Sequence, residues 1–231
     1  MIDWHSHILP GVDDGSRDID ESLELLKMLK EQGIGTVVAT PHFYANDESP
    51  DSFCERRNAA YNSLVEALPE GTPLIRLGAE VRYYPGIGRM SDLKKLRIEG
   101  TKLLLLEMPM SKWTEFTVRE LIELAGSREI TLVLAHIERY LSLQKPDVWR
   151  RLYESGILMQ VNASFFTGFG TKHKAINYLS EGKIHFVGSD THNTTSRPPV
   201  IDKAFEIISK KLGEDFLCQM NEYGHSVLAK K

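Results

Sequence analysis

The chain has 231 residues, enough for one large domain with a substantial hydrophobic core, and we expect residues 1–231 to form a single domain. A formal net charge of −4, with Lys and Arg scattered along the chain, argues against a nucleic-acid-binding protein. The two cysteines, Cys54 and Cys218, lie far apart, which excludes a thiolate metal cluster and fits a reducing cytoplasm. No apolar run reaches the roughly 18 residues that span a bilayer, so we expect a cytoplasmic protein without membrane insertion.

The first half of the chain alternates between short apolar runs and helical patterns. Residues 2–5 predict a short strand, followed by a polar stretch and an amphipathic helix at 20–32. The β-branched run GTVVAT predicts a buried strand at 35–40, and a second helix is expected at 50–68. The run PLIRLGA then predicts a third strand at 73–79.

The second half continues this alternation. Its predicted elements are a short helix at 90–97, a strand at 102–106, a helix at 115–127, a strand at 130–135, a helix at 147–155, a strand at 157–161, a helix at 171–181, a strand at 183–188, and helices at 198–212 and from 214 onward. The seven strands are almost continuously apolar, which is typical of a parallel sheet covered on both faces. We therefore expect an α/β fold, either a closed or nearly closed barrel or, as the alternative, an open doubly wound sheet.

Side chains that can bind a cation follow nearly every predicted strand. They are His5, His7 and Asp14 after the first strand, His42 after the second, Glu80 after the third, Glu107 after the fourth, His136 after the fifth, and Asp190 and His192 after the seventh. In a parallel barrel these strand ends meet at one rim, where active sites lie. Histidines and carboxylates without thiolates suit Zn, Mn or Fe, and nine ligands exceed what one ion can use. The sequence therefore predicts a shared site for two or three divalent metal ions.

Six short motifs occur in order along the chain: DWHSHILPGVDDG, TPH, GAE, LEMP, AHIERY and SDTHN. Together they resemble the polymerase and histidinol phosphatase (PHP) family, over nearly the whole chain as far as Pro199. More narrowly, HILPGVDDG and the later RPP are similar to the bacterial protein-tyrosine phosphatases linked to capsular and exopolysaccharide synthesis. The resemblance implies a distorted seven-stranded (β/α)7 barrel, similar to a TIM barrel, that holds three divalent ions.

The resemblance also implies roles for individual residues. One ion would be held by His5, His7, Glu80 and Asp190, a second by Glu80, Glu107 and His136, and the third by Asp14, His42 and His192. Arg139 and Arg197 match an arginine pair of these phosphatases, and planar guanidinium groups suit the charge on a phosphoryl group. Asn162 matches no ligand and is expected beside the site.

Other residues receive weaker assignments. Asp3 lies inside the first strand and is expected to orient a ligand histidine. Aromatic residues near the rim, among them Tyr83 and Phe165, either bind a tyrosine ring of the substrate or pack in the core. The remaining histidines, His173, His185 and His225, do not follow strands in this way and are interpreted as structural or surface residues.

The leading hypothesis is a metal-dependent protein-tyrosine phosphatase. Its substrate would be a phosphotyrosine protein, namely a bacterial tyrosine kinase that controls polysaccharide synthesis. Two close ions can lower the pKa of a water and orient the ester for attack, and a phenolate leaving group, whose conjugate acid has a pKa of about 10, requires no strong general acid. A phosphocysteine route is excluded, because neither cysteine is followed six positions later by an arginine.

Two alternatives stay open at this point. One is a small-molecule phosphatase that acts on histidinol phosphate or a sugar phosphate. The other is a non-catalytic regulator that binds metal at the same rim. The sequence does not fix the oligomeric state, although relatives of this kind include homo-oligomers.

Overall fold

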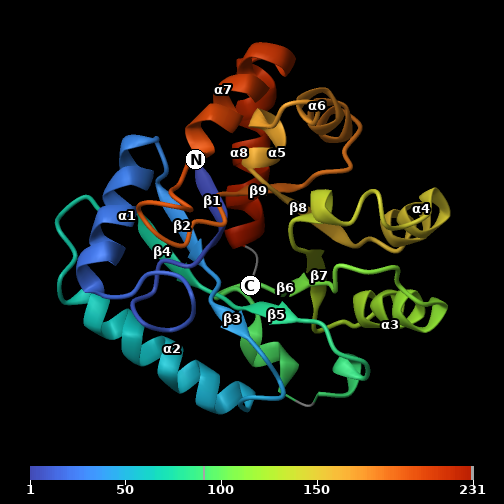
Figure 1. Cartoon of the computed structure of the whole chain (residues 1–231), viewed down its shortest axis with the longest axis horizontal. Coiled ribbons are helices and arrows are strands. Elements are labelled where there is room, and N and C mark those ends of the chain that lie inside the picture. The colour runs from blue at the N-terminus through green and yellow to red at the C-terminus, as the bar shows by residue number, and fades with distance from the viewer. Residues whose placement is uncertain (91, 230–231) are drawn as a thin grey trace.

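In the computed structural model, which describes residues 1–90 and 92–229, parallel strands form two adjoining sheets surrounded by helices (Figure 1). The three-stranded sheet has the order β1 (Ile2–Ser6), β2 (Thr36–Ala39) and β4 (Leu74–Leu77). The six-stranded sheet has the order β3 (His42–Phe43), β5 (Glu80–Arg82), β6 (Leu103–Glu107), β7 (Thr131–Leu134), β8 (Leu158–Asn162) and β9 (Phe186–Gly188). All of these pairings are parallel, so the α/β fold with a parallel sheet is confirmed.

The predicted count of seven strands is not confirmed, because two further strands, β3 and β5, follow the second and third predicted strands. The chain passes from β2 to β3 through residues 40–41, and from β4 to β5 through residues 78–79. Pro41 lies in the first break and has no N–H group to donate to a ladder. Pairing resumes between His42 and Glu80 in the register that β2 and β4 hold before the breaks. The two neighbouring strands therefore bend together at one level.

The strands curl round until the segment after β9 lies against β1. The N–H of His7 donates to the carbonyl of Thr191 at 2.9 Å, and the N–H of Asp190 donates to the carbonyl of His5 at 2.8 Å. Gly188 allows this approach, because a Cβ at that position would lie only 2.5 Å from the Cβ of His5. The carboxyl ends of strands that are distant in sequence are thereby brought to one side of the molecule.

Helices lie on the outside of the sheets (Figure 1). They are α1 (Ile19–Glu31), α2 (Pro50–Val65), α3 (Glu115–Ala125), α4 (Pro146–Glu154), α5 (Ser164–Thr167), α6 (Lys172–Ser180), α7 (Ile201–Leu212) and α8 (Glu214–Ala229), with 3-10 helices η1 (Ile87–Arg89), η2 (Leu93–Leu96) and η3 (Ile137–Arg139). Helices α1, α2 and α3 begin at side chains that cap them; the carboxylate of Asp18, for example, accepts the N–H of Glu21 at 2.9 Å. Within the described residues, no helix has the length and apolar character that crossing a membrane requires.

One predicted helix differs from the structure. At 90–97 the chain forms only the 3-10 helix η2, and residue 91 of that prediction lies outside the described residues. No side chain caps the N-terminus of η2, and only Leu93 and Leu96 within it are buried, so this segment lacks both a start signal and a full apolar face. The short elements α5, η1 and η3 were not predicted, since three or four residues carry no readable helical period.

Alternate residues of the strands pack in two apolar clusters. In β6, Leu104 and Leu106 belong to the large cluster shared with the outer helices, whereas Leu103 and Leu105 belong to a smaller cluster with Ile2, Trp4 and Val227. Side chains alternate along a strand, so Glu107 extends from the same face of β6 as Leu103 and Leu105. The smaller cluster, which includes Val227 of α8, therefore lies beneath the carboxylate of Glu107 at the end of β6.

Candidate metal centre

The nine predicted ligands lie together at the carboxyl ends of the strands. Each of them has an imidazole nitrogen or carboxylate oxygen within 3.7 Å of another member of the set. Asp14 is exposed and His42 is half-buried, and the other seven are buried. Residues that are up to 187 positions apart in sequence, such as His5 and His192, thus contribute to one cluster.

Glu80, the first residue of β5, lies at the centre of this cluster. Its Oε2 atom is 3.2 Å from Nε2 of His5, 3.3 Å from Nε2 of His7 and 3.1 Å from Nδ1 of His42. Its Oε1 atom is 2.8 Å from Nε2 of His136. Burial alone would raise the pKa of this carboxyl, but the surrounding imidazoles hold it well below its usual range. A carboxylate between four imidazoles has the position that a bridging ligand requires.

The donor atoms form three compact groups, in each of which all the ligand atoms lie within 4.8 Å of one another. These groups are His7, Asp14, His42 and His192; His5, His7 and Asp190; and His42, Glu80 and Glu107. They overlap with the three ligand sets implied by the resemblance, but they share His7 and His42, include Glu80 in one group alone and leave out His136. The structure thus brings the nine residues into one cluster, which His136 joins through its contact with Glu80 at 2.8 Å.

The chemistry of these side chains fits divalent cations. Nδ1 of His42, although it is 3.1 Å from Oε2 of Glu80, and Nε2 of His192 are buried and make no contact with hydrogen-bond geometry among the described residues. Burial lowers the pKa of His136, and burial together with the charge on His7 lowers that of His192 to about 4. Neutral imidazoles and ionised carboxylates are the forms that ligate Zn, Mn or Fe.

Two of these residues have left-handed backbone conformations, which are rare outside glycine. His136 has φ 33° and ψ 54°, directly after β7, and Asp190 has φ 53°, after β9. Hydrogen bonds hold both: the N–H of His136 donates to Oε1 of Gln160 at 2.7 Å, and that of Asp190 to the carbonyl of His5. Strained backbone of this kind clusters at functional sites.

Several imidazoles are fixed by residues that the sequence did not single out. Nδ1 of His7 is 2.7 Å from the carboxylate of Asp13, which with Glu80 raises the pKa of His7 to about 10 although burial opposes this. Nδ1 of His136 is 3.0 Å from the hydroxyl of Tyr140. Nδ1 of His5 is 3.3 Å from Oε1 of Gln160. A glutamine in a mostly apolar strand was the sequence feature that could have indicated this role.

Asp3 contacts the predicted ligand His5 through its backbone N–H rather than through its imidazole. Its carboxylate accepts the backbone N–H of Ser189 at 2.7 Å, the hydroxyl of Ser189 at 2.6 Å and the backbone N–H of His5 at 3.3 Å. Asp3 therefore ties β1 to the segment after β9. Asn162 lies beside the site as expected, and its side-chain amide donates to Oδ2 of Asp190 at 2.7 Å.

Arg139 and Arg197 converge on Asp190. Their Nη2 atoms lie 2.6 Å and 3.0 Å from Oδ2 of this carboxylate, and about two fifths of each side chain is exposed. A third arginine, Arg82, makes a similar ion pair with Glu107, with Nη1 2.5 Å from Oε2. Guanidinium groups thus border the imidazole and carboxylate cluster at the surface.

Comparison with known proteins decides the family of this chain. A family model described as "Capsular polysaccharide synthesis, CpsB/CapC" matches residues 1–224. The chain belongs to the CpsB/CapC family. It is 33% identical over 229 residues to tyrosine-protein phosphatase CpsB of Streptococcus agalactiae serotype III (strain NEM316), with 93% of this chain and 92% of the relative covered. It is 31% identical over 236 residues to tyrosine-protein phosphatase YwqE of Bacillus subtilis (strain 168), covering 99% of this chain and 91% of the relative.

The fold of this CpsB/CapC-family chain is also similar to a solved structure. That crystal structure comes from work on YwqE from Bacillus subtilis and CpsB from Streptococcus pneumoniae, described as unique metal-dependent tyrosine phosphatases. The TM-score is 0.84 at 26% sequence identity, and the match covers 100% of this chain and 96% of the other. The curled parallel sheet described above is thus shared with a metal-dependent member of the CpsB/CapC family.

The aromatic residues predicted to bind substrate are mostly buried in this CpsB/CapC-family chain. The hydroxyl of Tyr83 donates to Glu120 at 2.7 Å, and burial together with this carboxylate raises the pKa of Tyr83 to about 12. Phe165 packs beside Phe166 and is 5% exposed. Their contact with a substrate ring stays a prediction. Tyr44 is more accessible than either of these two residues, since it is 40% exposed, and its ring lies 5.5 Å from that of His42.

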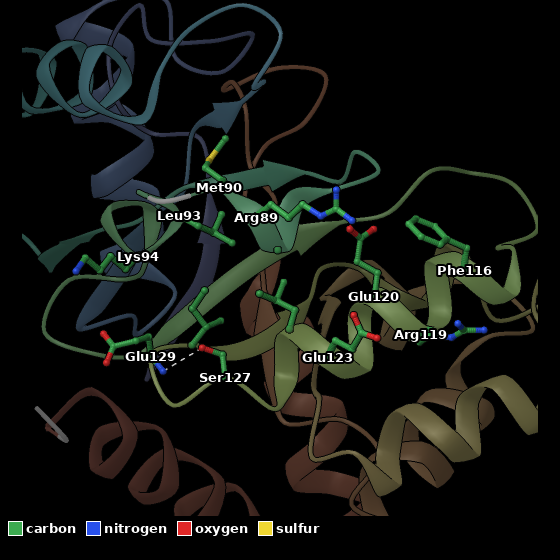
Figure 2. Close-up of a pocket in the computed structure, with 13 residues that line it drawn as sticks. Arg89, Met90, Leu93, Lys94, Phe116, Arg119, Glu120, Glu123, Ser127 and Glu129 are labelled. Carbon is green, nitrogen blue, oxygen red and sulfur yellow. Dashed lines mark hydrogen bonds between the residues drawn. The ribbon is translucent and has the colours of Figure 1, made fainter.

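A separate groove of about 590 Å³ lies between α3 and the segment that contains η1 and η2 (Figure 2). Figure 2 shows side chains of both signs along it, among them Arg89, Lys94, Glu120 and Glu123. The residues that line it lie outside the set of nine predicted ligands. In this CpsB/CapC-family chain, the cluster of predicted ligands and the groove are therefore distinct features.

Proposed function

We propose that this chain is a metal-dependent protein-tyrosine phosphatase that hydrolyses the phosphate monoester of phosphotyrosine. The observation that carries the proposal is the cluster of nine imidazoles and carboxylates around Glu80, bordered by the guanidinium groups of Arg139 and Arg197. The names of the CpsB and YwqE relatives and the fold shared with a metal-dependent tyrosine phosphatase support it.

The nine residues would hold two or three divalent ions, of Mn, Fe or Zn, with Glu80 between them. When bound, such ions supply Lewis-acid chemistry and an activated water for attack on a phosphate ester. The chain's own groups keep the ligands ready, because Asp13, Tyr140 and Gln160 fix the imidazoles of His7, His136 and His5. Little reorganisation is then required when the ester binds.

Arg139 and Arg197 would bind the phosphoryl group. Each guanidinium carries five N–H donors, and each uses one nitrogen in the ion pair with Asp190, so donors remain for substrate oxygens. Phenolate leaves readily at neutral pH, since the pKa of phenol is about 10. Tyr83 and Phe165 remain proposed neighbours of the substrate ring, and the exposed ring of Tyr44 is a further candidate.

The barrel architecture, the physiological substrate, the cellular location and the oligomeric state predicted from the sequence are part of the same proposal. If each divided strand, β2 with β3 and β4 with β5, counts as one bent strand, seven strand segments surround a distorted barrel. The physiological substrate would be a tyrosine kinase that controls capsular or exopolysaccharide synthesis. The protein would act in the cytoplasm, and its assembly into a homo-oligomer is part of the proposal.

Metal removal combined with one substitution tests the proposed function. Protein depleted of metal by a chelator should not release phosphate from a phosphotyrosine peptide, and added Mn²⁺ should restore turnover. The His136→Ala variant should stay inactive with Mn²⁺, because the cluster loses the ligand paired with Glu80. His173→Ala is the matched control, since His173 is exposed on α6, and it should retain full activity.

Three results would contradict the proposal. One is normal turnover by the His136→Ala variant, and another is much faster hydrolysis of histidinol phosphate than of the phosphopeptide. The third is full metal occupancy without phosphate release from any aryl ester, which would favour the non-catalytic regulator.

A further inference from the structure

Two carboxylates of the cluster divide their oxygens in the same way between imidazoles and arginines. Oδ1 of Asp190 faces the cluster, 3.5 Å from Nε2 of His7 and 3.7 Å from Nε2 of His5. Oδ2 of Asp190 faces outward and accepts from Arg139 and Arg197. The inward oxygen is thus free to bind a cation while the outward oxygen holds the guanidinium groups in place.

Glu107 repeats this arrangement with Arg82. Its Oε1 atom is 3.7 Å from Nε2 of His136, and its Oε2 atom is 2.5 Å from Nη1 of Arg82. The exposed fraction of the Arg82 side chain is 39%, between the 36% of Arg139 and the 41% of Arg197. Arg82 therefore has the same carboxylate contact and the same accessibility as the two arginines assigned to phosphate.

Arg82 is also the most rigidly mounted of the three. It lies in β5, two residues after Glu80, and its backbone is paired directly with that of Glu107 in β6. Arg139 and Arg197, by contrast, lie in η3 and in a loop after β9. A side chain on a paired strand presents its donors in a more defined geometry than one on a loop.

The charges favour an anion near Arg82 once cations are bound. Four carboxylates, Asp14, Glu80, Glu107 and Asp190, supply negative charge to the cluster. A cation bound by Oε1 of Glu107 would partly neutralise this carboxylate. Its ion pair with the guanidinium group of Arg82 would then be weaker. The one hydrogen bond that the Arg82 side chain makes among the described residues uses Nη1, so its remaining guanidinium N–H groups are available to phosphoryl oxygens.

We propose that Arg82 is a third phosphate-binding arginine of this site, which contacts the substrate phosphoryl group from the β5–β6 side while it holds Glu107. This inference rests on the proposed function, because it names a further residue of the same site. It adds a guanidinium on β5, which β6, β7 and β8 separate from β9, the strand that Asp190 follows. Guanidinium groups would then contact the negatively charged equatorial oxygens of the phosphoryl group from more than one direction.

Calorimetric binding of inorganic phosphate to Mn²⁺-loaded protein tests the role of Arg82 without relying on turnover. The Arg82→Met variant should bind phosphate roughly 10-fold more weakly or worse, as expected for loss of a charge-assisted hydrogen bond. Arg82→Lys, which keeps the charge without the planar fork, should bind with intermediate affinity. Arg151→Met is the matched control, because Arg151 pairs with Glu115 between two helices outside the site, and it should leave phosphate binding unchanged.

A parallel titration of metal-depleted protein with Mn²⁺ distinguishes an effect of Arg82 on metal binding from an effect on phosphate binding. Weaker Mn²⁺ binding by Arg82→Met with unchanged phosphate affinity of the fully loaded protein would mean that Arg82 only supports Glu107, and would overturn the inference. Unchanged phosphate affinity in both variants would overturn it as well. Wild-type protein that binds phosphate through Arg82 but releases none from a phosphopeptide would contradict the proposed function and leave this inference standing.

Discussion

At the scale of single residues, Asp13 shows how one carboxylate organises two ligands. Its oxygens accept from Nδ1 of His7 at 2.7 Å, from the backbone N–H of His42 at 2.8 Å and from the backbone N–H of Gly15 at 3.0 Å. Burial would raise its pKa, yet the contact with His7 and these N–H groups hold that pKa well below the usual range. Asp13 thereby fixes the imidazole of one ligand and the backbone of another.

Replacing Asp13 by Asn should weaken metal binding without unfolding the protein. An amide offers one acceptor oxygen to three donors, so a donor of His7, His42 or Gly15 is left facing an NH₂ group. We expect 10- to 100-fold weaker Mn²⁺ affinity, the range typical of residues that orient a metal ligand. Calorimetric titration of metal-depleted protein measures it. Asp20→Asn, an exposed change on α1, should behave as wild type, and equal affinities for both variants would disprove the role of Asp13.

The contrast between Asp3 and Asp13 shows what the sequence can reveal at this scale. Placement of the nine residues after strands follows from local patterns, and the structure brings all nine together. Which acid supports which imidazole depends on contacts across the fold. Asp3 bonds to Ser189, 186 positions away, and the turn after β1 directs Asp13 back to His7. No local pattern encodes either contact.

At the scale of elements, most helices and strands follow the predicted ranges, and the exceptions have physical causes. The strand predicted at 102–106 is β6, and the helix predicted at 115–127 is α3 with a slightly earlier end. The strands β3 and β5, which follow the breaks at residues 40–41 and 78–79, were missed because they are only two and three residues long. A bend that neighbouring strands share depends on their pairing, which a single sequence does not display.

Where β8 pairs with β9, one backbone N–H of β8 bonds to a histidine side chain instead of a backbone carbonyl. We therefore expect the stability of the protein to depend on pH. Nδ1 of His185 accepts the N–H of Met159 at 3.1 Å, and burial lowers the pKa of His185 below the ordinary value of about 6.5. In the unfolded chain this imidazole takes up its proton near pH 6.5, before the folded protein does. Stability is therefore fully present above that pH and is lost as the pH falls towards the folded pKa.

The His185→Asn variant isolates this contribution, because its amide oxygen can accept the same N–H but does not titrate. Urea denaturation of both proteins between pH 7.5 and pH 5 should give free energies of unfolding that diverge as the pH falls, with the wild type losing more. Parallel curves across this range would show that the imidazole of His185 does not control stability.

At the scale of the whole molecule, the proposed metal ligands come from both sheets and from both the N-terminal and C-terminal parts of the chain. β1 supplies His5, β5 supplies Glu80, β6 supplies Glu107, and the segment after β9 supplies Asp190 and His192. The contact between β1 and that last segment closes the curl of the sheets. Ions bound by these residues would therefore connect parts of the fold that a single helix or hairpin does not join.

Metal binding should accordingly stabilise the entire domain rather than one loop. Ions that bind the native but not the unfolded chain add RT ln(1 + [L]/Kd) for each site, about 2.7 kcal/mol at a free concentration of 100 Kd. Calorimetric unfolding of metal-depleted protein should show one transition that moves to higher temperature as Mn²⁺ is added. In the His192→Ala variant the shift should be smaller, because one donor group, His7, Asp14, His42 and His192, loses a member. A transition temperature that does not respond to Mn²⁺, or an equal shift in both proteins, would contradict this coupling between the cluster and the closed fold.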